Sequence, residues 1–546
     1  MSRRWSILTA SALFVCSVAT SALVPLLDPD EGYYPATAAE SLRSQPAWDL
    51  TFNGEPRWEK PFLSYGLIQA SFLAFGQSAI TARLPSAVEG ACLILFVGAI
   101  VAALAGARAG GLASVVVSST LALQIFSRAA HPEIAVVLSI VTTDLLICLW
   151  LGDSRHRRGR WIPWIAGCCV GYGVLAKGPV AVVLPTLMTV AALAWRRRLP
   201  LLGESVRAVG AAACTAAIVA LPWFVAMAWR HGPAFLNEAL WSQNVTRYTS
   251  GAYGHQASWT FFIVPTLVGL LPWTGFLPRA LVNLRAGEAS TERQWLRVCM
   301  ASAALTAFAF YTLSGSKLAN YTLVIIPPLA ILVALSFDDR VDLARRASIW
   351  DRALPAAVLL ILGVAVLLLP LAVGRLISIR ELLGGVPARG LDVVGAVRLA
   401  VLAPGLALLA AGAAALSRRP RVQASALACA GFVVPLMLLV GARPLLHADY
   451  PWEQFGARIR AEAGPVWLVG YRAPSLTFYA SRPVTLVTDV GELRDVLRAR
   501  VAGWIVLEQD VYNDSLATAA LHDTGIEIVA TGGRMVLLRV RPTHAG

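Results

Sequence analysis

Apolar runs recur along most of this 546-residue chain, and many are long enough to cross a lipid bilayer. A transmembrane helix needs about 20 mostly apolar residues to cross ~30 Å of hydrocarbon. The chain is 57% hydrophobic and only 14% charged, which excludes a soluble protein. We predict an α-helical polytopic membrane protein with thirteen spans, near residues 6–27, 85–105, 111–127, 133–151, 161–176, 179–195, 206–229, 259–278, 297–315, 320–337, 353–373, 397–416 and 422–441.

Arginine-rich loops between the predicted spans fall on one and the same side of the membrane. They occupy residues 2–4, 155–160, 196–198, 279–297, 340–352 and 417–421. Cytoplasmic loops carry an excess of Lys and Arg, so we assign these loops to the cytoplasm. The net charge of +14 is then mostly a signal of topology and gives no support for nucleic-acid binding.

The first apolar segment follows Arg3-Arg4 and has some features of a cleavable signal peptide. It is long for the apolar part of such a signal, so we expect it to stay as a span. The loop 28–83 then lies outside. With an odd number of spans, the C-terminus lies outside as well.

The last hundred residues alternate short apolar runs with polar, periodic ones. They predict strands at Val466–Gly470, Val484–Val487, Trp504–Leu507, Ile526–Ala530 and Met535–Val540, with helices near 491–501 and 512–522. About a hundred residues can form a core of their own. We therefore divide the chain into a transmembrane domain, 1–445, and a small external α/β domain, 446–546.

The first external loop, 28–83, is too long for a simple connection. Residues 35–44 and 62–75 have apolar positions at helical spacing, as expected for helices that lie in the membrane interface. Such helices would hold Asp30, Glu31 and Lys60 against the bilayer surface.

Lysine is rare and has a distinctive placement in this chain. Only three of the 46 basic residues are lysines, and each lies in a short motif at the predicted mouth of a membrane helix: Glu59-Lys60-Pro61, Lys177-Gly178-Pro179 and Ser316-Lys317. A compact ammonium at such a site suits a phosphate ligand. The alternative is an arginine-rich GC-biased sequence with three leftover lysines.

Several motifs occur in order at suitable depths: Asp30-Glu31 with Tyr34, Glu59-Lys60-Pro61, Ala82-Arg83-Leu84-Pro85-Ser86, Lys177-Gly178-Pro179, Leu221-Pro222-Trp223, Asn244 with Arg247-Tyr248, Pro272-Trp273, Ser316-Lys317-Leu318 with Tyr321, and residues 471–479. In these motifs, across nearly its whole length, the chain resembles the polyprenyl-phosphate-dependent GT-C glycosyltransferases. Within them it is similar to the bacterial aminoarabinose transferase (ArnT-like) and protein O-mannosyltransferase branch.

The resemblance implies a GT-C fold and a bacterial inner-membrane enzyme, expected to be monomeric, with its active site and C-terminal domain in the periplasm. Such an enzyme takes a sugar from an undecaprenyl or other polyprenyl monophosphate and passes it to an acceptor with inversion. As the glycosidic bond breaks, charge develops on phosphate oxygens. Cations aimed at those oxygens stabilise the transition state more than the ground state.

By resemblance, Lys60, Arg247 and Tyr321 hold the carrier phosphate, and Lys177 and Lys317 are further candidates for this role. Each of these residues also has a purely structural alternative, and for Lys60 we favour the functional reading. Arg247 could reach toward lipid headgroups, and Tyr321 could belong to an interfacial aromatic belt. Lys177 could serve only to fix the Gly-Pro turn.

The resemblance also assigns roles to carboxylates. Asp30 matches the family's catalytic aspartate and would deprotonate a hydroxyl acceptor, while Glu31 would position the acceptor or keep a second charge nearby. Glu133 stands where the family usually has a second aspartate. The alternative is that Asp30 and Glu31 cap a helix and that Glu133 only complements a helix dipole.

Tyr34, Arg83, Asn244 and His255 are candidates for substrate binding. Some relatives use a glutamate beside the loop lysine and a histidine near the arginine as metal ligands, but this chain has Asn244 in that stretch, and Glu59 alone makes no site. We therefore predict no cofactor and leave a divalent metal as an alternative. His255 could be a ligand, a proton carrier or a solvated loop residue.

The sugar and the acceptor stay open at this stage. A lipid phosphate, as in lipid A, is already ionised, and Asp30 would then only orient it, whereas a glycan or protein hydroxyl needs a base.

Two other classes of function also remain. A flippase for lipid-linked sugars should show paired repeats and charges near the midplane, and a silent membrane anchor for the α/β domain does not explain the first loop.

Overall fold

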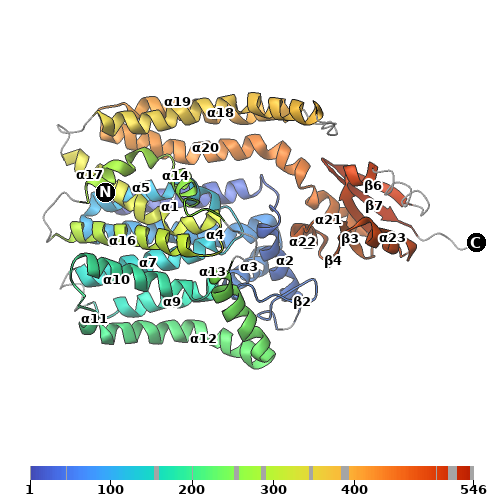
Figure 1. Cartoon of the computed structure of the whole chain (residues 1–546), viewed down its shortest axis with the longest axis horizontal. Helices are drawn as coiled ribbons and strands as arrows, with labels where there is room; N and C mark the ends of the chain where they lie inside the picture. The colour runs from blue at the N-terminus through green and yellow to red at the C-terminus, as the bar shows by residue number, and fades with distance from the viewer. Residues whose placement is uncertain are drawn as a thin grey trace, which may run out of the picture.

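The computed structural model describes residues 2–44, 46–152, 159–199, 201–250, 257–284, 291–342, 349–382, 393–499, 501–513 and 526–541. It consists of a bundle of long helices with a small α/β domain at one end (Figure 1). The N-terminus lies at the opposite end of the bundle from the α/β domain (Figure 1).

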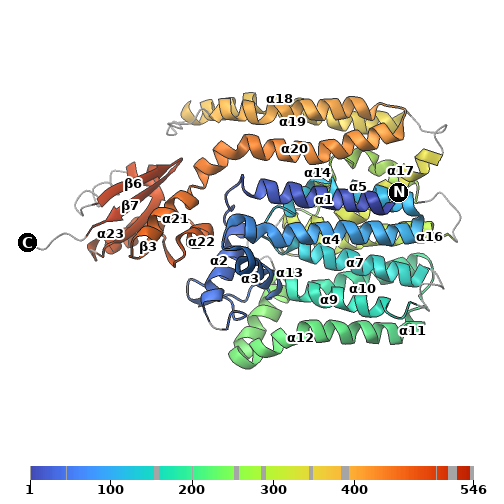
Figure 2. The same cartoon turned by 180° about the vertical axis from the view of Figure 1, so that it is seen from behind.

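The axes of the longer bundle helices run roughly along the long direction of the molecule (Figures 1 and 2). The bundle contains long and short helices. They are α1 (Ser2–Ser21), α4 (Ala79–Ala105), α5 (Ala107–Ser118), α6 (Leu121–Phe126), α7 (Glu133–Gly152), α9 (Ile162–Lys177), α10 (Val180–Trp195), α11 (Leu201–Glu204), α12 (Val206–Leu236), α14 (Ile263–Gly269), α15 (Leu277–Val282), α16 (Glu292–Leu313), α17 (Ile326–Asp342), α18 (Trp350–Leu382), α19 (Val393–Ala415) and α20 (Pro420–Asp449).

Eight helical stretches in the described residues are long and apolar enough to cross a membrane. Further apolar helices, including α9 and α10, are shorter. These helices confirm the predicted class, a multi-pass α-helical membrane protein. The number thirteen stays a prediction.

Two predicted spans are not single helices. The span predicted at 111–127 is interrupted between α5 and α6, and the span predicted at 259–278 is interrupted between α14 and η2 (Thr274–Phe276). At the first break the backbone N–H of Leu121 donates to the Leu271 carbonyl, 2.8 Å away. The Trp273 indole N–H donates to Ser119 Oγ over 3.0 Å. The two breaks therefore hydrogen-bond each other, which allows irregular backbone inside a bundle.

The first external loop contains α2 (Asp30–Arg43), a short hairpin of β1 (Thr51–Phe52) and β2 (Glu55–Pro56), and α3 (Leu63–Phe75). Both helices predicted in this loop are confirmed as helices. Figure 2 shows them at the end of the bundle that adjoins the α/β domain.

The C-terminal domain has the predicted α/β character. Its sheet has the order β4 (Val484–Val487), β3 (Val466–Val469), β5 (Gly503–Glu508), β7 (Met535–Val540) and β6 (Ile526–Gly532). The first three strands are parallel, and β7 and β6 join antiparallel. Its helices are α21 (Trp452–Ala461), α22 (Pro474–Ala480), α23 (Val490–Arg498) and α24 (Gln509–Asn513).

All five predicted strands are present, with ends that shift by one or two residues. Most of the helix predicted at 512–522 lies outside the described residues. α20 runs on to Asp449, and the division of the chain at residue 446 stays a prediction.

The α/β domain and the first loop share one hydrophobic core. Tyr65 and Phe72 of α3 belong to the same buried cluster as Trp452, Leu476 and Phe478 of the C-terminal domain. The two segments lie about 400 residues apart in the sequence, yet they pack as one unit. This unit covers the end of the bundle where the candidate site lies.

Candidate functional site

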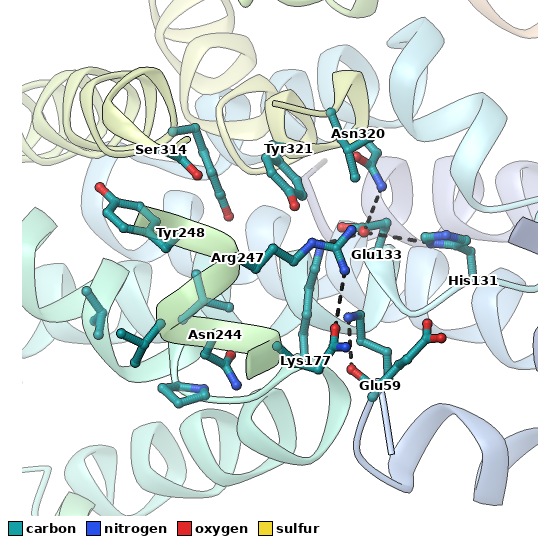
Figure 3. A pocket seen from close by; sticks show the side chains of 18 of the residues that line it. Glu59, His131, Glu133, Lys177, Asn244, Arg247, Tyr248, Ser314, Asn320 and Tyr321 are labelled. Atoms are coloured by element: carbon teal, nitrogen blue, oxygen red, sulfur yellow. Dashed lines mark hydrogen bonds and ion pairs between the residues drawn. The ribbon is translucent and has the colours of Figure 1, made fainter. Parts of the chain in front are cut away.

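A cavity of about 430 Å³ opens where the first loop meets the ends of the bundle helices. Side chains from α2, the loop before α3, the start of α7, the turn between α9 and α10, and the segment after α12 line it. Figure 3 shows this cavity with its polar side chains turned inward. The charged residues around it are Asp30, Arg57, Glu59, Lys60, His131, Glu133, Lys177 and Arg247.

Two helix ends place an ion pair in this cavity. α7 begins at Glu133, directly after Pro132, and α9 ends at Lys177 because Gly178 adopts a φ of +90° that only glycine tolerates well. Lys177 Nζ lies 2.5 Å from Glu133 Oε1, and Asn320 Nδ2 donates to the same oxygen over 2.9 Å. The Glu133 side chain is only 3% exposed, so it needs these partners.

His131 lies on the other side of Glu133, with its Nδ1 3.8 Å from Glu133 Oε1. Its ring packs edge-on against Tyr34 of α2. Burial lowers the pKa of His131, although the Glu133 carboxylate acts in the opposite direction. A neutral imidazole is thus favoured beside the ion pair.

Lys60 enters the cavity from the loop before α3. Its Nζ donates to the Glu59 carbonyl over 2.9 Å. Burial, and then the nearby Arg247 and Lys177 cations, lower the pKa of Lys60 to about 7, while the Glu59 and Glu133 carboxylates partly offset them. The charged form of a lysine that is surrounded by cations is unfavourable unless an anion binds beside it.

Arg247 reaches the cavity through a sharp turn in the chain. At Gly232, with a φ of +63°, the chain leaves the direction of α12, and residues 237–246 continue as the π-helix η1. This segment brings Asn244 to the cavity, and the short helix α13 (Arg247–Thr249) that follows it brings Arg247 there (Figure 3). Arg247 Nη1 lies 3.4 Å from Gln243 Oε1, and Asn244 Nδ2 donates to the Ala239 carbonyl over 2.8 Å.

Tyr321 belongs to the short helix η3 (Ala319–Val324). Its ring stacks on Tyr311 with 4.8 Å between centroids, and Lys177 Nζ lies 4.9 Å from its centroid. Figure 3 shows its hydroxyl turned toward Arg247. The hydroxyl therefore remains oriented to donate to a ligand.

Asp30 is the first residue of α2, and its side chain is exposed at the cavity. Tyr34, one turn later, is buried and also lines the cavity. The structure thus brings together eight of the predicted site residues around one cavity: Asp30, Tyr34, Lys60, Glu133, Lys177, Asn244, Arg247 and Tyr321.

Glu31 and Arg83 are not among the residues that line the cavity. They form a buried bidentate ion pair, with Nε–Oε1 and Nη2–Oε2 distances of 2.6 and 2.8 Å. The Glu31 carboxylate also accepts from the backbone N–H groups of Leu27 and Ala130. Both side chains are fully engaged by the protein, and their predicted roles at the substrate stay predictions.

Lys317 and His255 complete the predicted set. Lys317 is not among the cavity-lining residues, and its Nζ donates to the Ser314 carbonyl over 2.8 Å. His255 lies outside the described residues. Among the residues that are described, no three His, Cys, Asp or Glu side chains are grouped to hold a metal ion.

Comparison with known proteins adds to this geometry. Residues 33–235 match the family described as dolichyl-phosphate-mannose-protein mannosyltransferase. Over 379 residues the chain is 30% identical to the undecaprenyl phosphate-alpha-4-amino-4-deoxy-L-arabinose arabinosyl transferase of Pseudomonas aeruginosa, which covers 67% of this chain and 66% of that protein. A second transferase of this name, from Pseudomonas fluorescens, is 27% identical over 66% of this chain and 61% of its own length.

A crystal structure of ArnT from Cupriavidus metallidurans bound to undecaprenyl phosphate superposes with a TM-score of 0.78. That comparison covers all of both chains at 20% sequence identity, so it establishes the fold. The chain belongs to the ArnT-like GT-C family. The sequence matches span less than two thirds of these two relatives' lengths.

Sequence reasoning missed several side chains in this ArnT-like cavity. Arg57 lies 3.1 Å from Glu59 and stacks over the Tyr33 ring, and Asn320 binds Glu133. His131 had a signal, since it stands two residues before Glu133. Arg57 had the same kind of signal, since it stands two residues before Glu59, and Asn320 directly precedes Tyr321. That Asn320 binds Glu133 could not be predicted, because only the fold brings these two segments together.

The described part of the cavity carries a small positive excess. Four cationic side chains, Arg57, Lys60, Lys177 and Arg247, face the carboxylates of Asp30, Glu59 and Glu133. Arg57 pairs with Glu59, and Lys177 pairs with Glu133. Lys60 and Arg247 line the same cavity as the exposed carboxylate of Asp30, so an anion and a second substrate could be bound side by side there.

Proposed function

We propose that this chain is an integral-membrane glycosyltransferase that moves a sugar from a polyprenyl monophosphate, such as undecaprenyl phosphate, to an acceptor outside the cytoplasm. The arrangement of Lys60 and Arg247 around one cavity with the exposed Asp30 carries this proposal. The names of the arabinosyl transferase relatives and the undecaprenyl phosphate bound to the similar ArnT structure support it.

In the proposed reaction, the bond between the anomeric carbon and the phosphate oxygen breaks while the acceptor oxygen bonds to the opposite face of that carbon. The sugar is transferred with inversion, and the polyprenyl phosphate leaves with the electron pair. Lys60, Arg247 and the Tyr321 hydroxyl stabilise the phosphate charge, which grows as the bond breaks. Lys177 forms an ion pair with Glu133 and adds positive charge beside the phosphate.

The acceptor determines the role of Asp30. We propose a lipid acceptor such as lipid A, whose phosphate oxygen is already ionised, and Asp30 then orients the acceptor. If the acceptor is a hydroxyl of a glycan or of a protein serine, Asp30 takes the proton as the oxygen attacks. Mass spectrometry of lipids, envelope glycans and secreted proteins from cells with and without the gene distinguishes these acceptors.

We place the protein in the bacterial cytoplasmic membrane as a monomer, with the cavity and the α/β domain on the periplasmic side. One observation supports this orientation, and a second favours a transferase over a transporter. The N-terminal arginines lie at the end of the bundle opposite the α/β domain (Figure 1), and cytoplasmic loops are enriched in such residues. The cavity lies where α7 begins and α9 ends, whereas a transporter needs its site near the membrane midplane.

Single substitutions in the purified protein test the function. With a polyprenyl-phosphate sugar as donor, Asp30→Asn and Lys60→Ala should each abolish transfer while expression and membrane insertion stay normal. Asp30 is exposed, so its loss should not unfold the protein. Glu55→Gln, at an exposed position of the same loop, is the matched control. Normal transfer by both site variants would refute the mechanism.

A further inference from the structure

Asp28 binds the α/β domain directly, two residues before Asp30. Its Oδ1 accepts from the Ser475 backbone N–H over 2.9 Å, and its Oδ2 forms a hydrogen bond with Ser475 Oγ. Ser475 lies at the start of α22. The α/β domain is therefore hydrogen-bonded to the chain just before α2 begins.

The packing at this contact is close enough to require glycine. A Cβ atom on Gly32 would lie 2.4 Å from Asp28 Oδ1 and 2.5 Å from the Ser475 nitrogen. Neither distance is compatible with a side chain. The first turn of α2 thus lies directly against the start of α22, without an intervening side chain.

Two more contacts join the first loop to the same domain. Asn53 Nδ2 donates to the Val484 carbonyl over 2.9 Å, and the Val484 N–H donates back to Asn53 Oδ1 over 3.2 Å. The Phe72 and Phe478 rings also meet, with 5.9 Å between centroids. The first loop therefore contacts the α/β domain at three separate segments.

The other side of the same turn is fixed to the membrane bundle. Glu31 binds Arg83 of α4, and Arg83 also donates to the carbonyls of Ser21, Val24 and Pro25. Asp30 thus stands between one neighbour fixed to the α/β domain, Asp28, and another fixed to the bundle, Glu31. Its own side chain projects into the cavity and is exposed.

We propose that Asp28 and Ser475 are positioning residues for Asp30, so that the α/β domain forms a structural part of the transfer site. This inference depends on the proposed function. An exposed carboxylate is positioned mainly by the backbone that carries it. A misplacement of about 1 Å at a reacting group can lower a rate about 100-fold.

The test compares variants of the full-length purified protein. Ser475→Ala removes the side-chain hydrogen bond to Asp28, and Asp28→Ala removes both bonds. We expect kcat to fall about tenfold or more, and furthest in Asp28→Ala, while the Kd for polyprenyl phosphate stays unchanged, because Lys60 and Arg247 bind it from other segments. Asp28→Asn, which can still accept from the Ser475 N–H and donate to Ser475 Oγ, should restore most of kcat.

Glu527→Gln is the matched control on the α/β domain, because it alters only an exposed ion pair with Arg541. A second readout needs no donor. Hydrogen exchange in the first turn of α2 should be faster in Ser475→Ala than in the wild type and unchanged in Glu527→Gln. This readout also shows whether the variant is folded, since exchange in the bundle helices should not change.

The outcomes separate the two proposals. Absence of transfer by the wild-type protein would refute the proposed function, and the exchange measurement would still test the link between α22 and α2. If the wild type is active, full kcat in both Asp28→Ala and Ser475→Ala would overturn the positioning role. Unchanged exchange in α2, or a parallel loss of donor affinity and kcat, would overturn it as well.

Discussion

At the scale of single residues, Lys60 shows how the surroundings set a side chain's chemistry. Burial and two neighbouring cations lower the pKa of Lys60 to about 7, far below the value of a solvated lysine. Without a ligand the ammonium form is unfavourable. A bound phosphate supplies the missing negative charge, so protonation of Lys60 and phosphate binding should favour each other.

This coupling predicts a pH dependence of binding. Affinity for polyprenyl phosphate should fall as pH rises through about 7, because Lys60 loses its charge in the free protein. Lys60→Arg should bind with a weaker pH dependence, since arginine stays charged. Calorimetry or a fluorescence competition assay between pH 6 and 8 measures this. An identical pH profile in Lys60→Arg would show that another group is responsible.

The same shift has a consequence for stability. Above pH 7 the folded protein releases the Lys60 proton, whereas an unfolded lysine keeps it to about pH 10.4. The unfolded state therefore binds more protons in this window, and this residue's contribution to stability rises with pH. When Lys60 is protonated and no ligand is bound, its charge is thus repelled by the neighbouring cations, which destabilises the folded protein.

The Lys177–Glu133 pair offers a second prediction at this scale. Their side chains are 13% and 3% exposed, so removing one partner leaves a buried charge. Lys177→Met should lower the free energy of unfolding by about 3 kcal/mol. Lys177→Met combined with Glu133→Leu should recover much of that loss without restoring transfer. Thermal unfolding in detergent measures the stabilities, and equal stability of the single and double variants would contradict the coupling.

At the scale of elements, the turn at Gly232 controls where Arg247 lies. Gly232 has a φ of +63° and a ψ of −148°, a conformation that is essentially restricted to glycine. The residues before it are fixed to the first loop, because Asp49 binds Arg230 Nε over 2.7 Å and His231 Nε2 over 2.8 Å. The helix η1 beyond the turn therefore leaves from a fixed point.

Gly232→Ala should disturb this arrangement. A Cβ at Gly232 meets no atom within 4 Å, so the expected strain of about 1–3 kcal/mol is purely conformational. We expect η1 to shift and the affinity for polyprenyl phosphate to fall as Arg247 moves. Gly210→Ala is a matched control in α12, where glycine has ordinary helical geometry and open space. Unchanged affinity in Gly232→Ala would show that the turn does not position Arg247.

At the scale of the whole molecule, the first loop and the α/β domain pack into one unit at one end of the bundle. Both must therefore face the same side of the membrane. In a cysteine-free background, a membrane-impermeant thiol reagent should label Glu55→Cys and Glu527→Cys in intact spheroplasts. Arg418→Cys should react only after permeabilisation. Labelling of Glu55→Cys from the cytoplasmic side alone would reverse the proposed orientation.

The sequence predicted the membrane class, the helices of the first loop and the strands of the α/β domain. Each depends on a local property. Apolar length decides whether a segment can cross a bilayer, and alternation of apolar and polar residues decides whether a segment suits a sheet with one buried face. The broken spans at Ser119 and Pro272 were not predicted, because their backbone and side-chain polar groups bind each other between segments that are distant in the sequence.

For the site, the resemblance seen in the sequence identified Asp30, Lys60 and Arg247 as candidates, but it also placed Glu31 at the site beside Asp30. Successive residues on a helix point about 100° apart, so two adjacent acids face different surroundings. The tertiary structure turns Asp30 toward the cavity and Glu31 toward Arg83. It alone decides which charges are already neutralised, because ion pairs form between segments that meet only when the chain has folded.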